Sequence, residues 1–170
     1  MKERDPKTKL SLSRRKFLAQ SATAGSIAAA YLSFPQKTYA ANGDTLKVGL
    51  VGCGGRGTGA AAQALAADKN IVLTAMADAF EDRLKSSLGI LKKQTEDRVQ
   101  VDPEHCFVGF DAYQKVIQSG VDVVLLAAPP GFRPAHLKAC VEAGKHVFCE
   151  KPVAVDGPGV RSVLQTVEEA

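Results

Sequence analysis

The sequence predicts an α/β protein in which helices cover both faces of one parallel sheet, a doubly wound fold. Short apolar runs alternate with helical patterns along most of the chain, which is typical of repeated strand–helix–strand units. A glycine-rich turn, Gly52–Gly57, joins the first apolar run to the first helical stretch. The run 121–127 is almost continuously apolar, as expected of a strand buried on both faces.

The elements follow in order along the chain. Five strands are expected as short apolar runs, at 46–51, 71–77, 105–108, 121–127 and 146–149. Five helices are expected between and after them, at 56–67, 80–93, 111–119, 134–143 and 157–170. Gly144 is the expected C-cap of the fourth helix, and Asp156 is the expected N-cap of the fifth. Alternation of this kind implies a parallel sheet with right-handed crossover connections.

Residues 1–41 resemble a twin-arginine export signal. Ser13–Leu18 contains a paired arginine followed by Phe-Leu, and no charge occurs from Phe17 to Gln36. Thr38-Tyr39-Ala40 then offers small residues at the positions that a signal peptidase reads. We therefore expect recognition by the twin-arginine translocase, cleavage before the folded domain 42–170, and a periplasmic or otherwise exported protein. An uncleaved membrane anchor and a disordered basic tail are the alternatives.

Charge and cysteine spacing exclude two classes of partner. The formal net charge is +4, but residues 1–41 hold eight Lys/Arg and two Asp/Glu, so the basic excess belongs to the leader. The remaining residues hold fourteen Lys/Arg and sixteen Asp/Glu, which argues against nucleic-acid binding. The four cysteines form no C-x-x-C pair and have no histidine at ligand spacing, so no metal site is expected. We expect small core residues, with disulfide pairing left open, at Cys53, Cys106, Cys140 and Cys149.

The glycine-rich turn has the spacing of a phosphate-binding loop. Gly52, Gly54 and Gly57 fit the pattern G-x-G-x-x-G between a strand and a helix. The first glycine permits the tight turn, the second lets the backbone approach a pyrophosphate, and the third lets the helix pack closely on the strand. The free N–H groups at the helix N-terminus favour an anion, and Arg56 adds a positive charge. A flexible glycine-rich loop is the alternative interpretation.

An acidic residue follows the second predicted strand at the matching distance. Asp78 lies twenty-one residues after Gly57, where a carboxylate accepts hydrogen bonds from the adenosine ribose of a dinucleotide. The same carboxylate would repel the 2′-phosphate of NADP, so NAD is the favoured cofactor. A positive charge from Arg83 or Lys85 nearby would compensate for this repulsion, so NADP is the alternative cofactor. A simple helix cap is the alternative role of Asp78. The turn and the aspartate together predict a Rossmann-type dinucleotide-binding domain.

A second signature, Glu150-Lys151-Pro152, follows the fifth predicted strand. The carboxyl ends of parallel strands meet at the edge of the sheet where ligands bind. Lys151 is therefore expected either beside a nicotinamide, donating a hydrogen bond to a substrate hydroxyl, or on the surface, paired with Glu150. Pro152 is a candidate for a cis peptide bond.

These segments together resemble the Gfo/Idh/MocA oxidoreductases, a family that includes glucose–fructose oxidoreductase and inositol dehydrogenase. The resemblance covers roughly residues 45–170 and rests on the turn Gly52–Gly57, Asp78, the loop Ala127–Pro130 with His136, and the string Ala143–Pro152. It implies an NAD(P)-binding site formed by Gly52, Gly54, Gly55, Arg56, Gly57, Asp78, Ala128, Pro129, His136, Glu150 and Lys151. It also implies that Lys151 is catalytic, assisting substrate binding and proton transfer.

The resemblance also implies an activity. Family members oxidise or reduce the CH–OH group of a sugar or cyclitol by hydride transfer, and the full-length protein is a candidate homo-oligomer. NAD-dependent glycoside cleavage by transient oxidation and elimination, and a non-catalytic cofactor-binding fragment, are the alternatives. The family's further acid/base residues lie in a C-terminal α/β domain that this sequence lacks, so we expect the Rossmann domain to be truncated before it.

Overall fold

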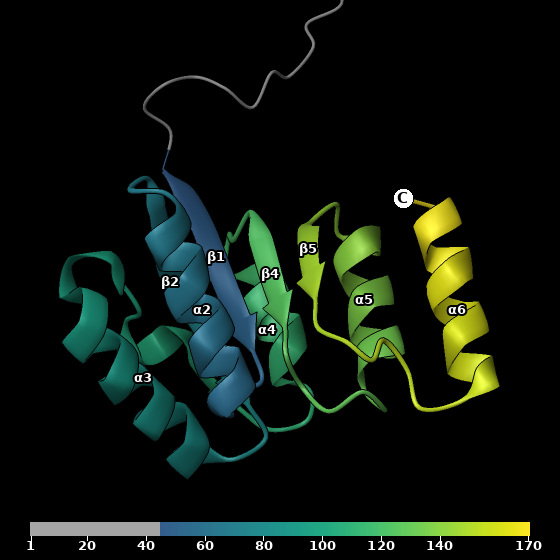
Figure 1. Ribbon diagram of the computed structural model, residues 1–170, viewed down its shortest axis with the longest axis horizontal. Helices are drawn as coiled ribbons and strands as arrows, with labels where there is room; N and C mark the ends of the chain where they lie inside the picture. Colours follow the sequence, from purple (N-terminus) through teal and green to yellow (C-terminus); the bar gives the residue numbers. More distant parts are fainter. Residues whose placement is uncertain (1–44) are drawn as a thin grey trace, which may run out of the picture. The chain divides into compact units, whose positions relative to one another are not determined.

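The computed structural model describes residues 45–170 (Figure 1). The export signal predicted at 1–41 lies outside the described residues. The described part of the chain lies within one compact unit, 43–170. No helix in this part is both long enough and apolar enough to cross a membrane.

Five strands form one sheet in which every neighbouring pair is parallel. The strands are β1 (Leu46–Val51), β2 (Ile71–Asp78), β3 (Cys106–Val108), β4 (Val123–Leu126) and β5 (His146–Cys149). Their order is β3-β2-β1-β4-β5, so the chain grows outward from β1 in one direction and then from β4 in the other. The doubly wound prediction is confirmed. The direction of winding switches between β1 and β4, where such sheets bind ligands at the carboxyl ends of their strands.

Helices cover both faces of the sheet because strand side chains alternate between two apolar layers. The helices are α2 (Gly55–Ala67), α3 (Glu81–Thr95), α4 (Ala112–Gln118), α5 (Arg133–Glu142) and α6 (Gly157–Glu168). Leu50 of β1 packs in the layer that also holds Leu65 of α2 and Leu84 of α3. Val51, the next residue, packs in the other layer with Val116 of α4 and Cys140 of α5.

Helix ends follow local sequence chemistry. The carboxylate of Asp156 accepts a hydrogen bond from the backbone N–H of Gly159 (2.7 Å), which confirms the predicted N-cap of α6. At the end of α5 the C-cap is Ala143 rather than the predicted Gly144. Gly144 follows it with φ 65°, the left-handed conformation that glycine adopts without strain after a helix.

Two strand boundaries differ from the sequence-based prediction. β3 begins at Cys106, and the predicted first residue, His105, ends a short 3-10 helix instead. Pro103 favours this turn, in which the N–H of His105 donates to the carbonyl of Asp102 (2.9 Å). β4 is shorter than the apolar run that predicted it, because only Val123–Leu126 pair with both neighbouring strands. Apolar character therefore extends beyond the hydrogen-bonded ladder.

The cysteines are free thiols in this structure. Cys53 and Cys140 are buried as predicted, whereas Cys106 and Cys149 are only half-buried. Burial raises the pKa of the Cys140 thiol to about 12, so this side chain behaves as a small apolar residue.

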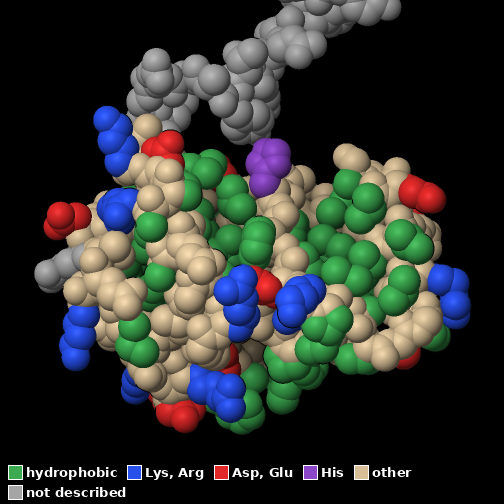
Figure 2. Space-filling model, viewed as in Figure 1, with side chains coloured by type: hydrophobic (Ala, Val, Ile, Leu, Met, Phe, Trp, Pro, Cys, Tyr) green, Lys and Arg blue, Asp and Glu red, His purple; other side chains and the backbone are tan. Residues whose placement is uncertain are grey.

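The side of the domain formed by β5 and α6 exposes apolar side chains. β5 is an edge strand with Phe148 exposed, and α6 exposes Leu164 and Val167. Figure 2 shows hydrophobic side chains gathered over this end of the molecule. This side contrasts with β1 and β2, whose side chains are mostly buried.

Candidate cofactor-binding site

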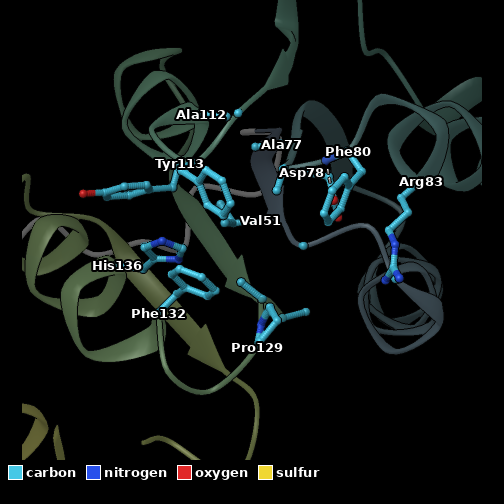
Figure 3. Close-up of a pocket in the computed structure, with 17 residues that line it drawn as sticks. Val51, Ala77, Asp78, Phe80, Arg83, Ala112, Tyr113, Pro129, Phe132 and His136 are labelled. Atoms are coloured by element: carbon cyan, nitrogen blue, oxygen red, sulfur yellow. Dashed lines mark hydrogen bonds between the residues drawn. The ribbon is translucent and has the colours of Figure 1, made fainter.

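A cavity of about 260 Å³ opens at the carboxyl ends of the strands (Figure 3). It lies at the switch point between β1 and β4, where the fold predicts a ligand. The residues that line it come from the ends of β1 and β2, from the segments that follow each of β1 to β4, and from the helices α3, α4 and α5: Val51, Gly52, Gly54, Ala77, Asp78, Ala79, Phe80, Arg83, Gly109, Phe110, Ala112, Tyr113, Ala127, Ala128, Pro129, Phe132 and His136.

Close backbone contacts shape the glycine turn. Gly52 has φ 98°, and a Cβ there would overlap the backbone of Ala128 in the loop after β4. A Cβ on Gly57 would overlap the carbonyl oxygen of Gly52. At these two glycines the turn touches the first turn of α2 and the loop after β4 through close contacts of backbone atoms. This explains the glycines at both positions and matches two of the reasons predicted from the sequence.

The N-terminus of α2 is arranged to receive an anion. Gly54 is the N-cap and has no side chain to satisfy the free N–H groups of the first turn. No acidic side chain occupies this turn. Gly55 has open space around its Cβ position and lines a separate groove between α2 and α3. A pyrophosphate fits this environment, because the helix dipole and the unpaired N–H groups both favour negative charge.

Asp78 holds the glycine turn as well as facing the cavity. Its Oδ2 accepts a hydrogen bond from the backbone N–H of Cys53 (2.6 Å), and its Oδ1 accepts one from the backbone N–H of Phe80 (2.9 Å). Each carboxylate oxygen has a second lone pair that remains available to a ligand hydroxyl. Asp78 therefore joins the end of β2 to the turn after β1. The bond from Phe80 closes a local turn just before α3, so it is not the helix cap that was the alternative role of Asp78.

Aromatic side chains form one wall of the cavity (Figure 3). The imidazole of His136 stacks on the Tyr113 ring, with 4.1 Å between ring centroids and an interplanar angle of 23°. The Phe132 ring lies on the other side of the imidazole, with 6.1 Å between the ring centroids of Phe132 and His136. The centroid of the Phe132 ring is 5.9 Å from that of Phe110. His136 is buried, which lowers its pKa to about 4, so the imidazole is neutral near pH 7. The wall is therefore apolar and uncharged, and it suits a planar ring.

The opposite side of the cavity carries a cation over an aromatic ring. The guanidinium of Arg83 lies 5.7 Å from the centroid of the Phe80 ring. Phe80 and Phe110 are 58% and 71% exposed, so much of the apolar surface of both rings is open to a ligand. Sequence reasoning did not identify these rings. Their position just after the carboxyl ends of β2 and β3 was the available signal.

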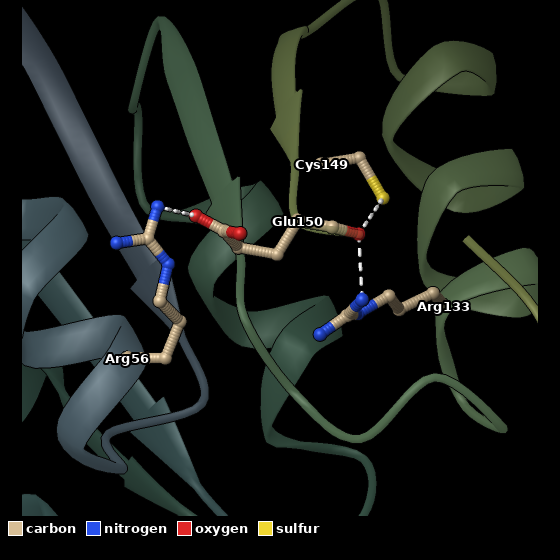
Figure 4. Close-up of polar contacts among 4 residues, drawn as sticks. All are labelled: Arg56, Arg133, Cys149 and Glu150. Atoms are coloured by element: carbon tan, nitrogen blue, oxygen red, sulfur yellow. Dashed lines mark hydrogen bonds and ion pairs between the residues drawn. The ribbon is translucent and has the colours of Figure 1, made fainter. Parts of the chain in front are cut away.

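Glu150 makes an ion pair that the sequence did not predict (Figure 4). Its buried carboxylate pairs with Arg56, from the first turn of α2. The hydrogen bond from Arg56 holds the pKa of Glu150 below its ordinary value, although partial desolvation opposes the shift. The same contact raises the pKa of Arg56. The ion-pair partner of Glu150 is Arg56, so the surface alternative for Lys151 is wrong in the partner that it predicted for Glu150.

Lys151 itself is exposed, and the Lys151–Pro152 peptide bond is cis. The backbone on both sides of Lys151 is held by Arg133, the first residue of α5. Arg133 is 5% exposed, and no pattern in the sequence indicated that this arginine would be buried.

The structure thus divides the predicted site residues into two groups. Those that line the cavity are Gly52, Gly54, Asp78, Ala128, Pro129 and His136. Those outside its lining are Gly55, Arg56, Gly57, Glu150 and Lys151. Gly57 packs on Gly52, and Arg56 joins the turn to Glu150 across the switch point. The individual roles of these residues in binding and catalysis remain predictions.

One group of potential metal ligands occurs within residues 45–170. Asp102, Glu104 and His105 approach one another on the 3-10 turn before β3. None of them lines the cavity, and both acidic residues are exposed.

Comparison with known proteins agrees with this geometry. Residues 46–170 match the family profile GFO_IDH_MocA, described as an oxidoreductase family with an NAD-binding Rossmann fold. The myo-inositol 2-dehydrogenase of Thermotoga maritima is 28% identical over 128 residues, which cover 74% of this chain and 34% of that protein.

Solved structures give the same result. The apo scyllo-inositol dehydrogenase of Lactobacillus casei has a TM-score of 0.58 and 26% identity, covering 74% of this chain and 34% of that one. The structure of scyllo-inositol dehydrogenase from this organism with bound NAD(H) and scyllo-inositol has a TM-score of 0.58 and 25% identity, with the same coverage of both chains. The chain spans about a third of the length of the curated relatives it matches.

Proposed function

This chain belongs to the Gfo/Idh/MocA oxidoreductases, and from this premise we propose that its cavity binds NAD for a dehydrogenase acting on a cyclitol or sugar. The observation that carries the proposal is the glycine turn, where an uncapped helix N-terminus lies beside a carboxylate at the end of β2. The inositol dehydrogenases among the relatives support a substrate with CH–OH groups.

The cavity and the helix N-terminus beside it suit different parts of the dinucleotide. The first turn of α2 would hold the pyrophosphate through backbone N–H groups. Asp78 would accept hydrogen bonds from the adenosine ribose hydroxyls, and Phe80 with Arg83 offers a surface on which the adenine stacks. The loop Ala128–Pro129 leads from the cavity toward Glu150, where the nicotinamide would lie.

NAD supplies a hydride acceptor when bound, and the protein orients the reacting groups. Lys151 is exposed next to the buried Glu150, so its ammonium is free to donate a hydrogen bond to a substrate hydroxyl. The hydrogen bond from Arg56 lowers the pKa of Glu150, so the carboxylate stays negative within its ion pair. Lys151 therefore serves as the proton-handling group of this domain.

Fluorescence titration tests the cofactor proposal. The full chain is titrated with NADH, and saturable binding is expected, with NAD competing for the same site. Net NADH production from NAD and an inositol would support the dehydrogenase activity. Absence of NADH binding by the folded chain would refute the proposal.

We also propose that residues 1–41 direct export through the twin-arginine route. The support is the Ser13–Leu18 pattern, the uncharged stretch after it and the small residues before Ala41. Replacing Arg14 and Arg15 together by lysine should keep the protein in the cytoplasm, as measured by cell fractionation. Export of the double variant at the wild-type level would contradict the proposal, and N-terminal sequencing of the exported wild type locates the cleavage site.

A further inference from the structure

Arg133 is a buried cation whose hydrogen bonds all go to backbone carbonyls. Its Nε donates to the carbonyl of Ala128 (2.8 Å), in the loop after β4. Its Nη1 donates to the carbonyls of Glu150 (2.6 Å) and Pro152 (2.5 Å), in the segment after β5. One guanidinium therefore ties together the two segments that follow β4 and β5. Figure 4 shows its bond to the carbonyl of Glu150.

The burial of this charge is compensated by its surroundings. A guanidinium taken out of water is costly unless its donors are paired and a counter-charge is near. The three carbonyls pair donors of Arg133, and the carboxylate of Glu150 lies close enough to interact with its charge. The planar fork of arginine reaches carbonyls in different directions, which one ammonium cannot do with the same geometry.

The placement of these bonds matters because they flank Lys151. The carbonyls of Glu150 and Pro152 belong to the residues immediately before and after Lys151. β5 ends at Cys149, and the one ladder-like bond beyond it runs from the N–H of Glu150 to the carbonyl of Leu126 (3.0 Å). From Lys151 onward no strand pairing holds the backbone. The hydrogen bonds from Arg133 to the carbonyls of Glu150 and Pro152 hold it instead.

We propose that Arg133 is a positioning residue: it fixes the backbone on both sides of Lys151, and so sets where the exposed ammonium stands relative to the cavity. The inference deepens the proposed function and rests on it for the role of Lys151. The alternative is that Arg133 only stabilises the domain as a whole.

Amide hydrogen exchange, measured residue by residue, distinguishes a positioning role of Arg133 from a purely stabilising one. The full chain is compared as wild type, Arg133→Lys, Arg133→Met and the matched control Arg161→Met, an exposed arginine on α6. We expect amide exchange in residues 148–153 to rise about tenfold in Arg133→Lys while β1 and β2 keep their protection. Arg133→Met should show a larger local rise, and Arg161→Met none. Arg133→Lys retains the positive charge, so it tests the inference even where Arg133→Met fails to fold.

Chemical labelling of Lys151 gives a second measurement. Acetylation by acetic anhydride is followed at Lys151 with and without NADH. NADH should protect Lys151 in the wild type, and Arg133→Lys should lose most of this protection while still binding NADH in a titration. Exchange in residues 148–153 that is unchanged, or that rises equally in every strand, would overturn the positioning role.

The two proposals can fail separately. If the wild type binds no NADH, the proposed function fails, and the exchange measurement still decides whether Arg133 holds this segment. If the wild type binds NADH and Arg133→Lys keeps both local protection and the NADH-dependent labelling of Lys151, only the positioning role fails.

Discussion

The two ends of the candidate site are held in place by different physics. The turn after β1 is shaped by steric contact between backbone atoms, since Gly52 and Gly57 have no space for a Cβ. The segment after β5 is shaped by charge, through buried Arg133 and the ion pair of Glu150 with Arg56. One end tolerates almost no added volume, and the other depends on donors that reach specific carbonyls.

This difference has consequences for how each end fails. A steric turn is broken by a single methyl group, and the damage spreads through the rigid contacts of helix and strand. A segment held by hydrogen bonds is released when the donor is removed, and the structural change stays near the carbonyls that lose their partner. The steric end suits the invariant part of a dinucleotide, its pyrophosphate. The polar end suits the reacting end of a site, where a lysine must be placed accurately.

The largest effect is expected from Gly57→Ala, which tests the steric end. The new methyl group would overlap the carbonyl oxygen of Gly52, so α2 must move away from β1. We expect a loss of about 2–4 kcal/mol in the free energy of unfolding, measured by urea denaturation, together with loss of NADH binding. The control Gly59→Ala adds the same methyl group in the same helix, where it meets no atom within 4 Å other than its chain neighbours and the nearby backbone of the helix.

Gly59→Ala should stabilise the protein by about 0.5–1 kcal/mol, because alanine favours the helix interior. Equal stability of the two alanine variants would show that the turn is not held by steric contact.

Asp78→Asn tests the polar contribution within the steric end. The variant removes the negative charge and leaves one carbonyl acceptor for the N–H of Cys53 or Phe80. We expect NADH affinity to fall about tenfold and the preference for NADH over NADPH to shrink by a similar factor, measured by fluorescence titration. Asp97→Asn, on an exposed position before β3, should leave both affinities unchanged. An unchanged NADH/NADPH ratio in Asp78→Asn would contradict the assigned role.

His136 provides a test of the aromatic wall between the two ends. Its pKa is lowered to about 4 in the folded protein from an ordinary value of 6.5, because it is buried. The unfolded chain therefore binds more protons between these values, so stability is full above pH 6.5 and falls as the pH drops toward 4. We expect this group to cost about 1–2 kcal/mol of stability between pH 7 and pH 5, measured by urea denaturation.

The variant His136→Leu should lack this part of the pH dependence, although it is less stable at pH 7. Tyr113→Phe keeps the ring that covers the imidazole and should retain the wild-type slope. A slope in His136→Leu equal to that of the wild type would show that His136 is not responsible.

The smallest effect is expected at the polar end, from Glu150→Gln. The pKa of Glu150 is lowered by its hydrogen bond from Arg56, so the ion pair stabilises the folded protein above the ordinary carboxyl range. This stabilisation is lost as the pH falls through the lowered pKa. Thermal unfolding should therefore show a smaller acid-induced decrease in Tm for Glu150→Gln and for Arg56→Met than for the wild type. Identical acid sensitivity of all three proteins would mean that the pair contributes nothing measurable, as for many exposed ion pairs.

The sequence by itself determined the order of strands and helices, the position of the glycine turn and the N-cap of α6. The bounds of β1 and β5 agree with the predicted ranges, because alternation of apolar runs and turn residues is a local property. The placement of His105 in β3 was wrong, since a proline-led turn outweighed the apolar run next to it.

The tertiary structure alone decided which side chains meet at the site. The pairing of Arg56 with Glu150, the stacking of His136 on Tyr113 and the burial of Arg133 join residues from different strand–helix units. An arginine in a sequence usually indicates exposed surface, and nothing local distinguishes one that will be buried. Its partners are backbone carbonyls, which every residue carries, so only folding brings them within reach and makes the burial of that charge favourable.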